Sequence, residues 1–109
     1  MRSMAMTVML CLGLAASAAA QDVKVAKGLQ VYADQKCSLC HSIAGKGNAK
    51  GSLDGVASKL SADEIRNWIS DAKGMTAKTK ATRKPEMKAF AQPKYDVDGL
   101  VAYLRTLKK

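Results

Sequence analysis

One pentapeptide, Cys37-Ser38-Leu39-Cys40-His41, constrains this chain more than any other feature. It has the C-x-x-C-H pattern by which a c-type haem is attached covalently. Residues three apart lie on one face of a helix, so two thiols at this spacing can each add across one vinyl group of the same porphyrin. The histidine that follows can then bring its imidazole under the iron as an axial ligand. Because the motif occurs once, we expect one haem c, bound through Cys37 and Cys40.

Three other interpretations of the cysteine pair are weaker. A zinc site would need further ligands to reach four, and the sequence has no second C-x-x-C. A dithiol redox motif would be expected beside a βαβ pattern, which is missing. A chance match is disfavoured by the histidine that directly follows the second cysteine and by an export signal at the start of the chain.

Residues 1–20 have the features of that secretory signal. Arg2 supplies a positive start, residues 8–16 are apolar, and Ala18-Ala19-Ala20 fits an A-x-A cleavage site. The alternative is a membrane anchor, but the apolar stretch is well short of the about 20 residues that a spanning helix needs. We therefore expect cleavage near Ala20, no stable membrane insertion afterwards, and a mature domain over residues 21–109.

The charge of the chain is strongly positive. It carries 18 Lys and Arg against 9 Asp and Glu, a net charge of +9, and cleavage would remove only Arg2. This excess favours acidic partners or anionic surfaces, through an attraction that weakens with salt. We expect no nucleic-acid partner, because the chain is exported and has no base-reading motif or basic-aromatic interleaving.

The mature region has the pattern of a helical protein. The spacing of apolar residues predicts one helix over 23–35 that runs into the cysteine motif, and a terminal helix that Asp96 or Asp98 caps and that ends at about Leu107. Between them a capping box predicts a helix over about 61–72, with a stop near Gly74. Its inward face would contain Ile65, Trp68 and Ile69. We expect an all-α fold of three to four helices wrapped around the haem.

The remaining stretches lack such periodicity. Residues 43–55 are rich in glycine, which predicts a loop. Residues 75–95 are polar and interrupted by two prolines, and we interpret them as mostly loop. No convincing strand, repeat or second domain is present.

The second axial ligand of the iron cannot be a histidine, because His41 is the only one in the chain. A methionine thioether is the natural substitute, and it raises the reduction potential. Outside the signal only Met75 and Met87 remain. We favour Met87, which lies in a proline-bounded loop just before the terminal helix, from where it can cross the haem face opposite His41. Met75, at the end of the middle helix, stays the alternative, as does an open or water-bound iron.

With these features the chain resembles the small class I c-type cytochromes of the bacterial periplasm. The resemblance covers essentially the whole mature region: a haem motif near its start, a methionine loop late, and an aromatic terminal helix. It implies a class I cytochrome c fold, ligation by His41 and Met87, and one-electron transfer in the periplasm. It also implies that Gly28 and Tyr32 meet Leu100 and Tyr103 where the first and last helices cross.

One departure from the family concerns the support of His41. The family commonly has Gly-Pro ahead of a leucine, and a backbone carbonyl there orients the histidine through its second ring nitrogen. This chain has Gly51-Ser52-Leu53, without the proline. We expect the carbonyl of Gly51 or Ser52 to accept this bond, which would orient the ligand and tune the metal. Trp68 either approaches a haem propionate, as in some relatives, or is a core tryptophan.

Three functions are compatible with a chain that binds one haem through these residues. The first is an electron carrier without enzymatic activity, a monomer that docks to acidic redox proteins through lysine-rich loops. The second is a dedicated haem subunit of a periplasmic dehydrogenase or oxidase, with the same residues but a large apolar interface. The third, a haem sensor or peroxidase-like protein with an open iron, requires that Met87 does not bind. Seven loop lysines are candidates for the docking surface: Lys46, Lys50, Lys73, Lys78, Lys80, Lys84 and Lys88.

Overall fold

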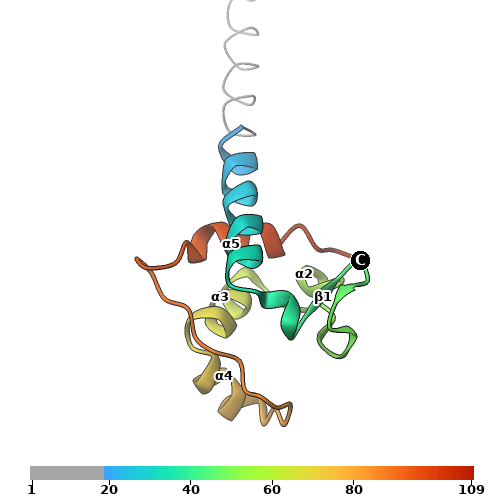
Figure 1. Cartoon of the computed structure of the whole chain (residues 1–109). Helices are drawn as coiled ribbons and strands as arrows, with labels where there is room; N and C mark the ends of the chain where they lie inside the picture. Colours follow the sequence, from blue (N-terminus) through green and yellow to red (C-terminus); the bar gives the residue numbers. More distant parts are fainter. Residues whose placement is uncertain (1–18) are drawn as a thin grey trace, which may run out of the picture.

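The N-terminal helix, seen over residues 19–34, stands across the C-terminal helix α5, Val97–Leu104 (Figure 1). The structure is a computed structural model that describes residues 19–109. The predicted signal peptide therefore lies outside the described residues except for its last two. These two are helical and continue directly into the N-terminal helix.

The crossing of these two helices is made possible by a glycine on each of them. A Cβ atom on Gly28 would lie 2.5 Å from the carbonyl carbon of Gly99 and 2.7 Å from Cβ of Tyr103. The backbones therefore touch, and only glycine fits at position 28 without a shift. One turn further on, the rings of Tyr32 and Tyr103 meet edge to face, with centroids 5.9 Å apart. The predicted crossing is confirmed at Gly28, Tyr32 and Tyr103, and Gly99 is an additional partner that we did not predict.

The segment after the N-terminal helix turns sharply and folds back on itself. Lys36 adopts a left-handed conformation (φ 54°) and starts the short 3-10 helix η1, Cys37–Leu39. An antiparallel pair of two-residue strands follows, β1 (Ser42–Ile43) and β2 (Lys46–Gly47). The second 3-10 helix, η2, covers Ala49–Gly51. The expectation of no strand was wrong at this hairpin, because a two-residue strand is too short to produce an alternating pattern.

The middle of the chain forms three helices. Helix α2 covers Val56–Lys59, and α3 covers Ala62–Ser70. The capping box predicted for α3 is present: Ser61 Oγ accepts from the Glu64 N–H, and the Glu64 carboxylate accepts from the Ser61 N–H. Ile65 and Ile69 face the core as predicted, whereas Trp68 is half-buried.

Helix α4, Ala72–Thr79, corrects the prediction for this region. We expected a stop near Gly74 and a loop from residue 75. Instead, Asp71 ends α3 and caps a new helix by accepting a hydrogen bond from the Gly74 N–H. Gly74 therefore lies in the first turn of a helix, where its N–H needs a side-chain partner, and does not act as a stop signal. The loop begins only at Lys80.

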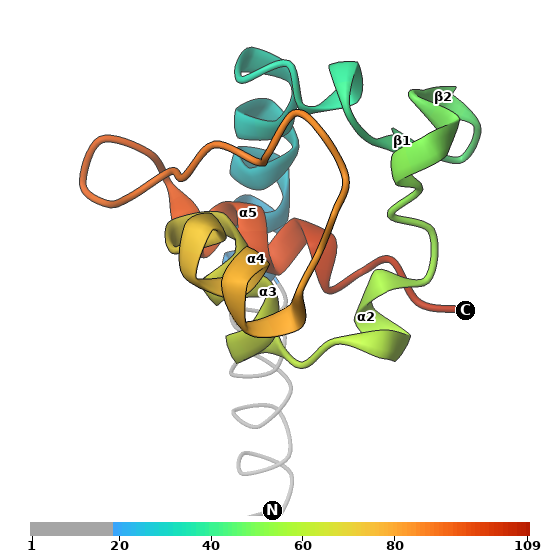
Figure 2. The same ribbon diagram turned by 90° about the horizontal axis from the view of Figure 1, so that it is seen from below.

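The core lies between α3, α5 and the N-terminal helix. It is formed by eight buried side chains, Tyr32, Ile65, Ile69, Phe90, Val97, Leu100, Val101 and Leu104. Helix α5 begins at the predicted cap Asp96, whose carboxylate accepts from the Gly99 N–H, but it ends at Leu104, three residues before the predicted end. The loop from residue 80 to 96 passes over the side of the molecule that the β-hairpin also borders (Figure 2).

This arrangement confirms the predicted all-α class. Four α-helices follow the N-terminal helix, and the strand content is limited to the hairpin. Within residues 19–109 no helix is both long and apolar enough to cross a bilayer.

We predict that Gly28→Ala lowers the free energy of unfolding by about 1–3 kcal/mol, the usual cost of overpacking. The added methyl group must displace the Gly99 backbone, although alanine is intrinsically the better helix former by about 1 kcal/mol. Denaturant unfolding of the haem-loaded protein, followed by circular dichroism, measures the change. The control is Gln30→Ala on the exposed face of the same helix. Equal stability of the two variants would contradict the close helix crossing.

Candidate functional site

A cavity of about 560 Å³ opens between the cysteine motif and the loop before α5. Its walls come from nearly every part of the fold. They include the N-terminal helix, α3, α5 and residues of the segments 35–53 and 81–90. Most of the lining side chains are apolar, among them Leu53, Leu60, Ile65, Leu100 and Leu104. The volume is within the range of about 300–1,000 Å³ that is usual for small-molecule and cofactor sites.

The histidine of the motif lines this cavity with a fixed ring orientation. His41 Nδ1 lies 2.9 Å from the carbonyl oxygen of Gly51. A carbonyl oxygen can only accept, so Nδ1 carries the proton and Nε2 keeps its lone pair for a metal. Burial lowers the pKa of His41, the bond to Gly51 opposes this, and the nearby Arg83 cation lowers the pKa further. The imidazole is thus neutral near pH 7, as a ligand must be.

The bond from His41 to Gly51 forms although the proline that is common in the family is missing from this segment. We expected the carbonyl of Gly51 or Ser52 to orient His41, and the acceptor is Gly51. The segment is held without a proline by the Leu53 N–H, which donates to the Ser42 carbonyl at 2.8 Å, and by the Asn48 N–H, which donates to the His41 carbonyl at 3.0 Å.

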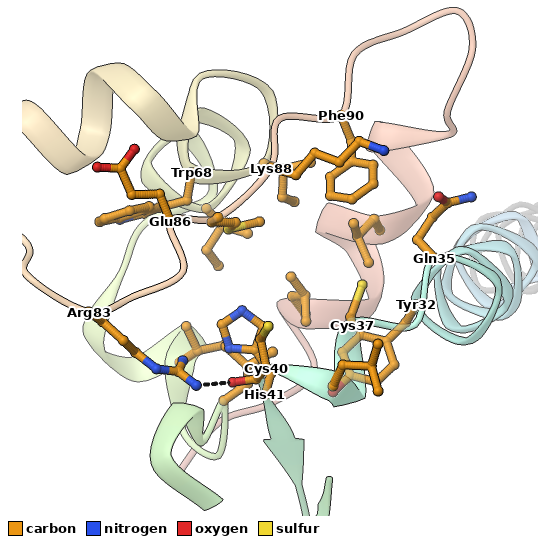
Figure 3. A pocket seen from close by; sticks show the side chains of 18 of the residues that line it. Tyr32, Gln35, Cys37, Cys40, His41, Trp68, Arg83, Glu86, Lys88 and Phe90 are labelled. Carbon is orange, nitrogen blue, oxygen red and sulfur yellow. Dashed lines mark hydrogen bonds between the residues drawn. The ribbon is translucent and has the colours of Figure 1, made fainter. Parts of the chain in front are cut away.

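Both cysteines of the motif also line the cavity. Cys37 and Cys40 are half-buried free thiols, and they lie with His41 on the same side of the cavity (Figure 3). Burial raises the pKa of the Cys37 thiol, and the neighbouring Cys40 adds to the rise. Before haem is attached, the Cys37 side chain is therefore a protonated thiol at neutral pH. Within residues 19–109 no group of three or more His, Cys, Asp or Glu side chains could hold a metal ion, so the zinc alternative gains no support.

The two candidate methionines occupy different environments. Met87 is half-buried and lines the cavity, whereas Met75 is buried in α4, with 8% of its surface exposed, and does not line it. The two neighbours of Met87, Glu86 and Lys88, lie across the cavity from His41 (Figure 3). The structure therefore brings Met87 and His41 to one cavity and leaves Met75 apart from it.

Two further residues of the cavity wall, Trp68 and Tyr32, carry a polar atom on an aromatic side chain. Trp68 lines the cavity and is partly exposed, so it is not a fully buried core tryptophan. Tyr32 also lines the cavity, and its buried hydroxyl has no hydrogen-bond partner. Burial raises the pKa of this phenol, so it stays neutral.

Sequence reasoning missed Arg83, which lines the cavity and donates a hydrogen bond to the Cys40 carbonyl. Its contact spans 43 positions of sequence, and nothing local distinguishes it from the other basic residues. Asn48 was likewise treated only as part of a loop. Its place in a glycine-rich stretch just after the motif was the one available signal, since asparagine favours such turns.

The residues at this cavity fit the haem that the motif predicts. Two thiols and one neutral imidazole lie on one side, and a thioether belongs to the lining as well. The apolar walls suit a large apolar plate, and they exclude water from it. The donor set of nitrogen and sulfur is the set that haem iron accepts from cytochromes.

Comparison with known proteins bears on the same residues. Neither the curated proteins nor the solved structures gave a match. The family model described as Cytochrome c matches residues 25–108, which includes the motif, the middle helices and the terminal helix. The match covers well over half of the chain. The chain therefore belongs to the cytochrome c family, and it binds haem c covalently through Cys37 and Cys40.

Proposed function

We propose that this protein is a periplasmic one-electron carrier and a monomer. We further propose that His41 and Met87 ligate its haem, and that exposed lysines dock it to acidic redox proteins. The family implies haem-based electron transfer. The observation that carries the rest is that His41 and Met87 line one cavity, while Met75 does not. The proposed export rests on the signal-like residues 1–20.

When bound, the haem supplies one-electron oxidation and reduction at its iron. The protein contributes the environment of that change. His41 is oriented by Gly51, and Met87 would close the opposite face, so that no position is open to a substrate. For this reason we propose transfer of electrons and no enzymatic turnover.

The loop that carries Met87 is anchored on either side of it, which supports its role as a ligand. Arg83 donates to the Cys40 carbonyl on the haem-attachment side. The Phe90 N–H donates to the Ile69 carbonyl at the end of α3, at 2.7 Å. Met87 lies between these two bonds, which restrain the backbone on both sides of it.

We predict that Met87→Ala abolishes the thioether-to-iron absorption band of the oxidised protein. The reduction potential should fall by on the order of 0.1 V, a fraction of the about 0.8 V that axial ligands span. Met75→Ala is the matched control, and it should keep the band. A variant Met87→Ala that retains the band, or a loss of the band in Met75→Ala, would assign the ligand elsewhere.

We predict that the double substitution Cys37→Ala and Cys40→Ala yields protein whose haem is extracted by acidic acetone, because both thioether bonds are absent. The wild type should keep its haem under the same treatment. Cys37→Ala alone leaves one thioether and one unreacted vinyl group, which should shift the pyridine haemochrome band to longer wavelength. Haem that resists extraction from the double variant would refute attachment at these two cysteines.

The basic rim consists of Lys36 and Lys88, two exposed lysines that line the cavity. All seven lysines predicted to lie in loops are exposed, but Lys73 and Lys78 belong to helix α4, and only Lys88 of the seven lines the cavity. Lys88 Nζ lies 5.7 Å from the centre of the Phe90 ring, which keeps the charge near the opening. Lys84 is partly neutralised by its ion pair with Glu86, at 2.9 Å. Such exposed charges act mainly on the rate of encounter.

We predict that ferricyanide, an anionic one-electron oxidant, oxidises the reduced protein more slowly as salt is added, because the Debye length falls to about 8 Å at 0.15 M. The double variant Lys36→Glu with Lys88→Glu should be several-fold slower at low salt. The control, Lys27→Glu with Lys59→Glu, makes the same change of charge at exposed sites that do not line the cavity. Equal slowing of both variants, measured by stopped flow, would refute a local role of the rim.

A further inference from the structure

Arg83 joins the two segments that would supply the axial ligands. It belongs to the loop between α4 and α5, four residues before Met87. Its guanidinium crosses to the haem-attachment segment, where Nη2 donates to the carbonyl oxygen of Cys40 (Figure 3). Cys40 immediately precedes His41. One side chain thus connects the loop of the proposed sixth ligand to the peptide that carries the fifth.

The same guanidinium also packs against Gly51. A Cβ atom at Gly51 would lie 2.9 Å from Cζ of Arg83, closer still to one of its nitrogens, and against the Cys40 carbonyl. Gly51 is the residue whose carbonyl oxygen accepts the His41 bond. The absence of a side chain at position 51 therefore lets Arg83 cover the backbone that orients the histidine, in the stretch where the family commonly has proline.

Within residues 19–109 no carboxylate forms an ion pair with Arg83. In the part of the chain that the structure describes, the ion pairs are Arg66 with Asp98 and Lys84 with Glu86. Arg83 takes part in neither and lines the cavity as a cation. Reduction of the iron removes one positive charge from the site, so a nearby cation favours the reduced form. Because Arg83 is exposed, solvent screens this effect in part.

We propose that Arg83 is a positioning residue of the haem site, which ties the Met87 loop to the Cys40 and Gly51 backbone and raises the reduction potential. This inference rests on the proposed function. It assigns two separable effects to one side chain: the hydrogen bond and packing restrain the loop, and the charge shifts the potential.

The charge effect is tested by spectroelectrochemistry of the haem-loaded protein at low ionic strength. Arg83→Gln keeps an N–H donor and removes the charge, and it should lower the equilibrium constant for reduction by about threefold, as expected for one partly screened charge. Arg83→Lys keeps the charge and should stay near the wild type. Lys94→Gln is the matched control, since it removes one positive charge from another exposed residue of the same loop, which does not line the cavity. Equal shifts in Arg83→Gln and Lys94→Gln would overturn the assignment of the potential to Arg83.

The restraint is tested by imidazole binding to the oxidised protein, because imidazole must displace the sixth ligand. Arg83→Ala and Arg83→Lys should both bind imidazole faster than the wild type, since both lose the planar contact with Cys40 and Gly51. Lys94→Ala, at an exposed residue of the same loop that does not line the cavity, should leave the rate unchanged. A rate in Arg83→Ala that equals the rate in Lys94→Ala would refute the restraint.

These results are distinguishable from failure of the proposed function. If Met87 were not the ligand, Met87→Ala would keep the absorption spectrum of the wild type and would not change imidazole binding. The comparison of Arg83→Gln with Lys94→Gln would still report whether Arg83 sets the potential, because it does not depend on the identity of the sixth ligand.

Discussion

The hydrogen bond between His41 Nδ1 and the Gly51 carbonyl is the contact on which the haem site depends. It selects the tautomer that leaves Nε2 available, and it fixes the plane of the ring. A proline could stiffen the accepting backbone, but here that task is carried by the fold of residues 41–53. The hairpin and the turn after it bring Leu53 back beside Ser42. The carbonyl of Ser42, a residue only 4% exposed, accepts a hydrogen bond from the Leu53 N–H. Buried backbone bonds of this kind are costly to break, so they restrain the segment that carries the Gly51 acceptor.

The helix crossing determines where this loop lies relative to the rest of the site. The haem motif begins three residues after the N-terminal helix ends, so the direction of the helix sets the position of Cys37. That direction follows from the contact of Gly28 with Gly99 and from the edge-to-face pair of Tyr32 and Tyr103. Tyr32 serves both regions, because it packs at the crossing and lines the cavity. Helix packing and cofactor binding are therefore coupled through the first helix.

Sequence reasoning reached those features whose signals are local. The motif, the Ser61–Glu64 capping box, the Asp96 cap and the crossing at Gly28 all depend on residues within a few positions or on a family resemblance. Helix α4 was missed, because a glycine and lysine-rich composition outweighed the Asp71 cap that starts it. The β-hairpin was missed because two-residue strands carry no periodicity. The place of Arg83 could not be predicted, since its partner is 43 residues away and the contact exists only in the folded chain.

The loop around Met87, the proposed ligand, has no regular structure but is held by a hydrogen bond on either side of the methionine. Its two anchors lie four residues before and three residues after the methionine, at Arg83 and Phe90. A fully extended chain spans at most about 3.6 Å per residue, so each anchor confines the Met87 backbone to within about 11–14 Å of a fixed point. Arg83 contacts the haem-attachment segment at Cys40 and Phe90 contacts the end of α3 at Ile69, so the two restraints act from different parts of the cavity wall. Exchange of the proposed ligand therefore requires one of these anchors to open, and the exposed contact of Arg83 is the weaker of the two, because the Phe90 bond belongs to a residue that is only 9% exposed.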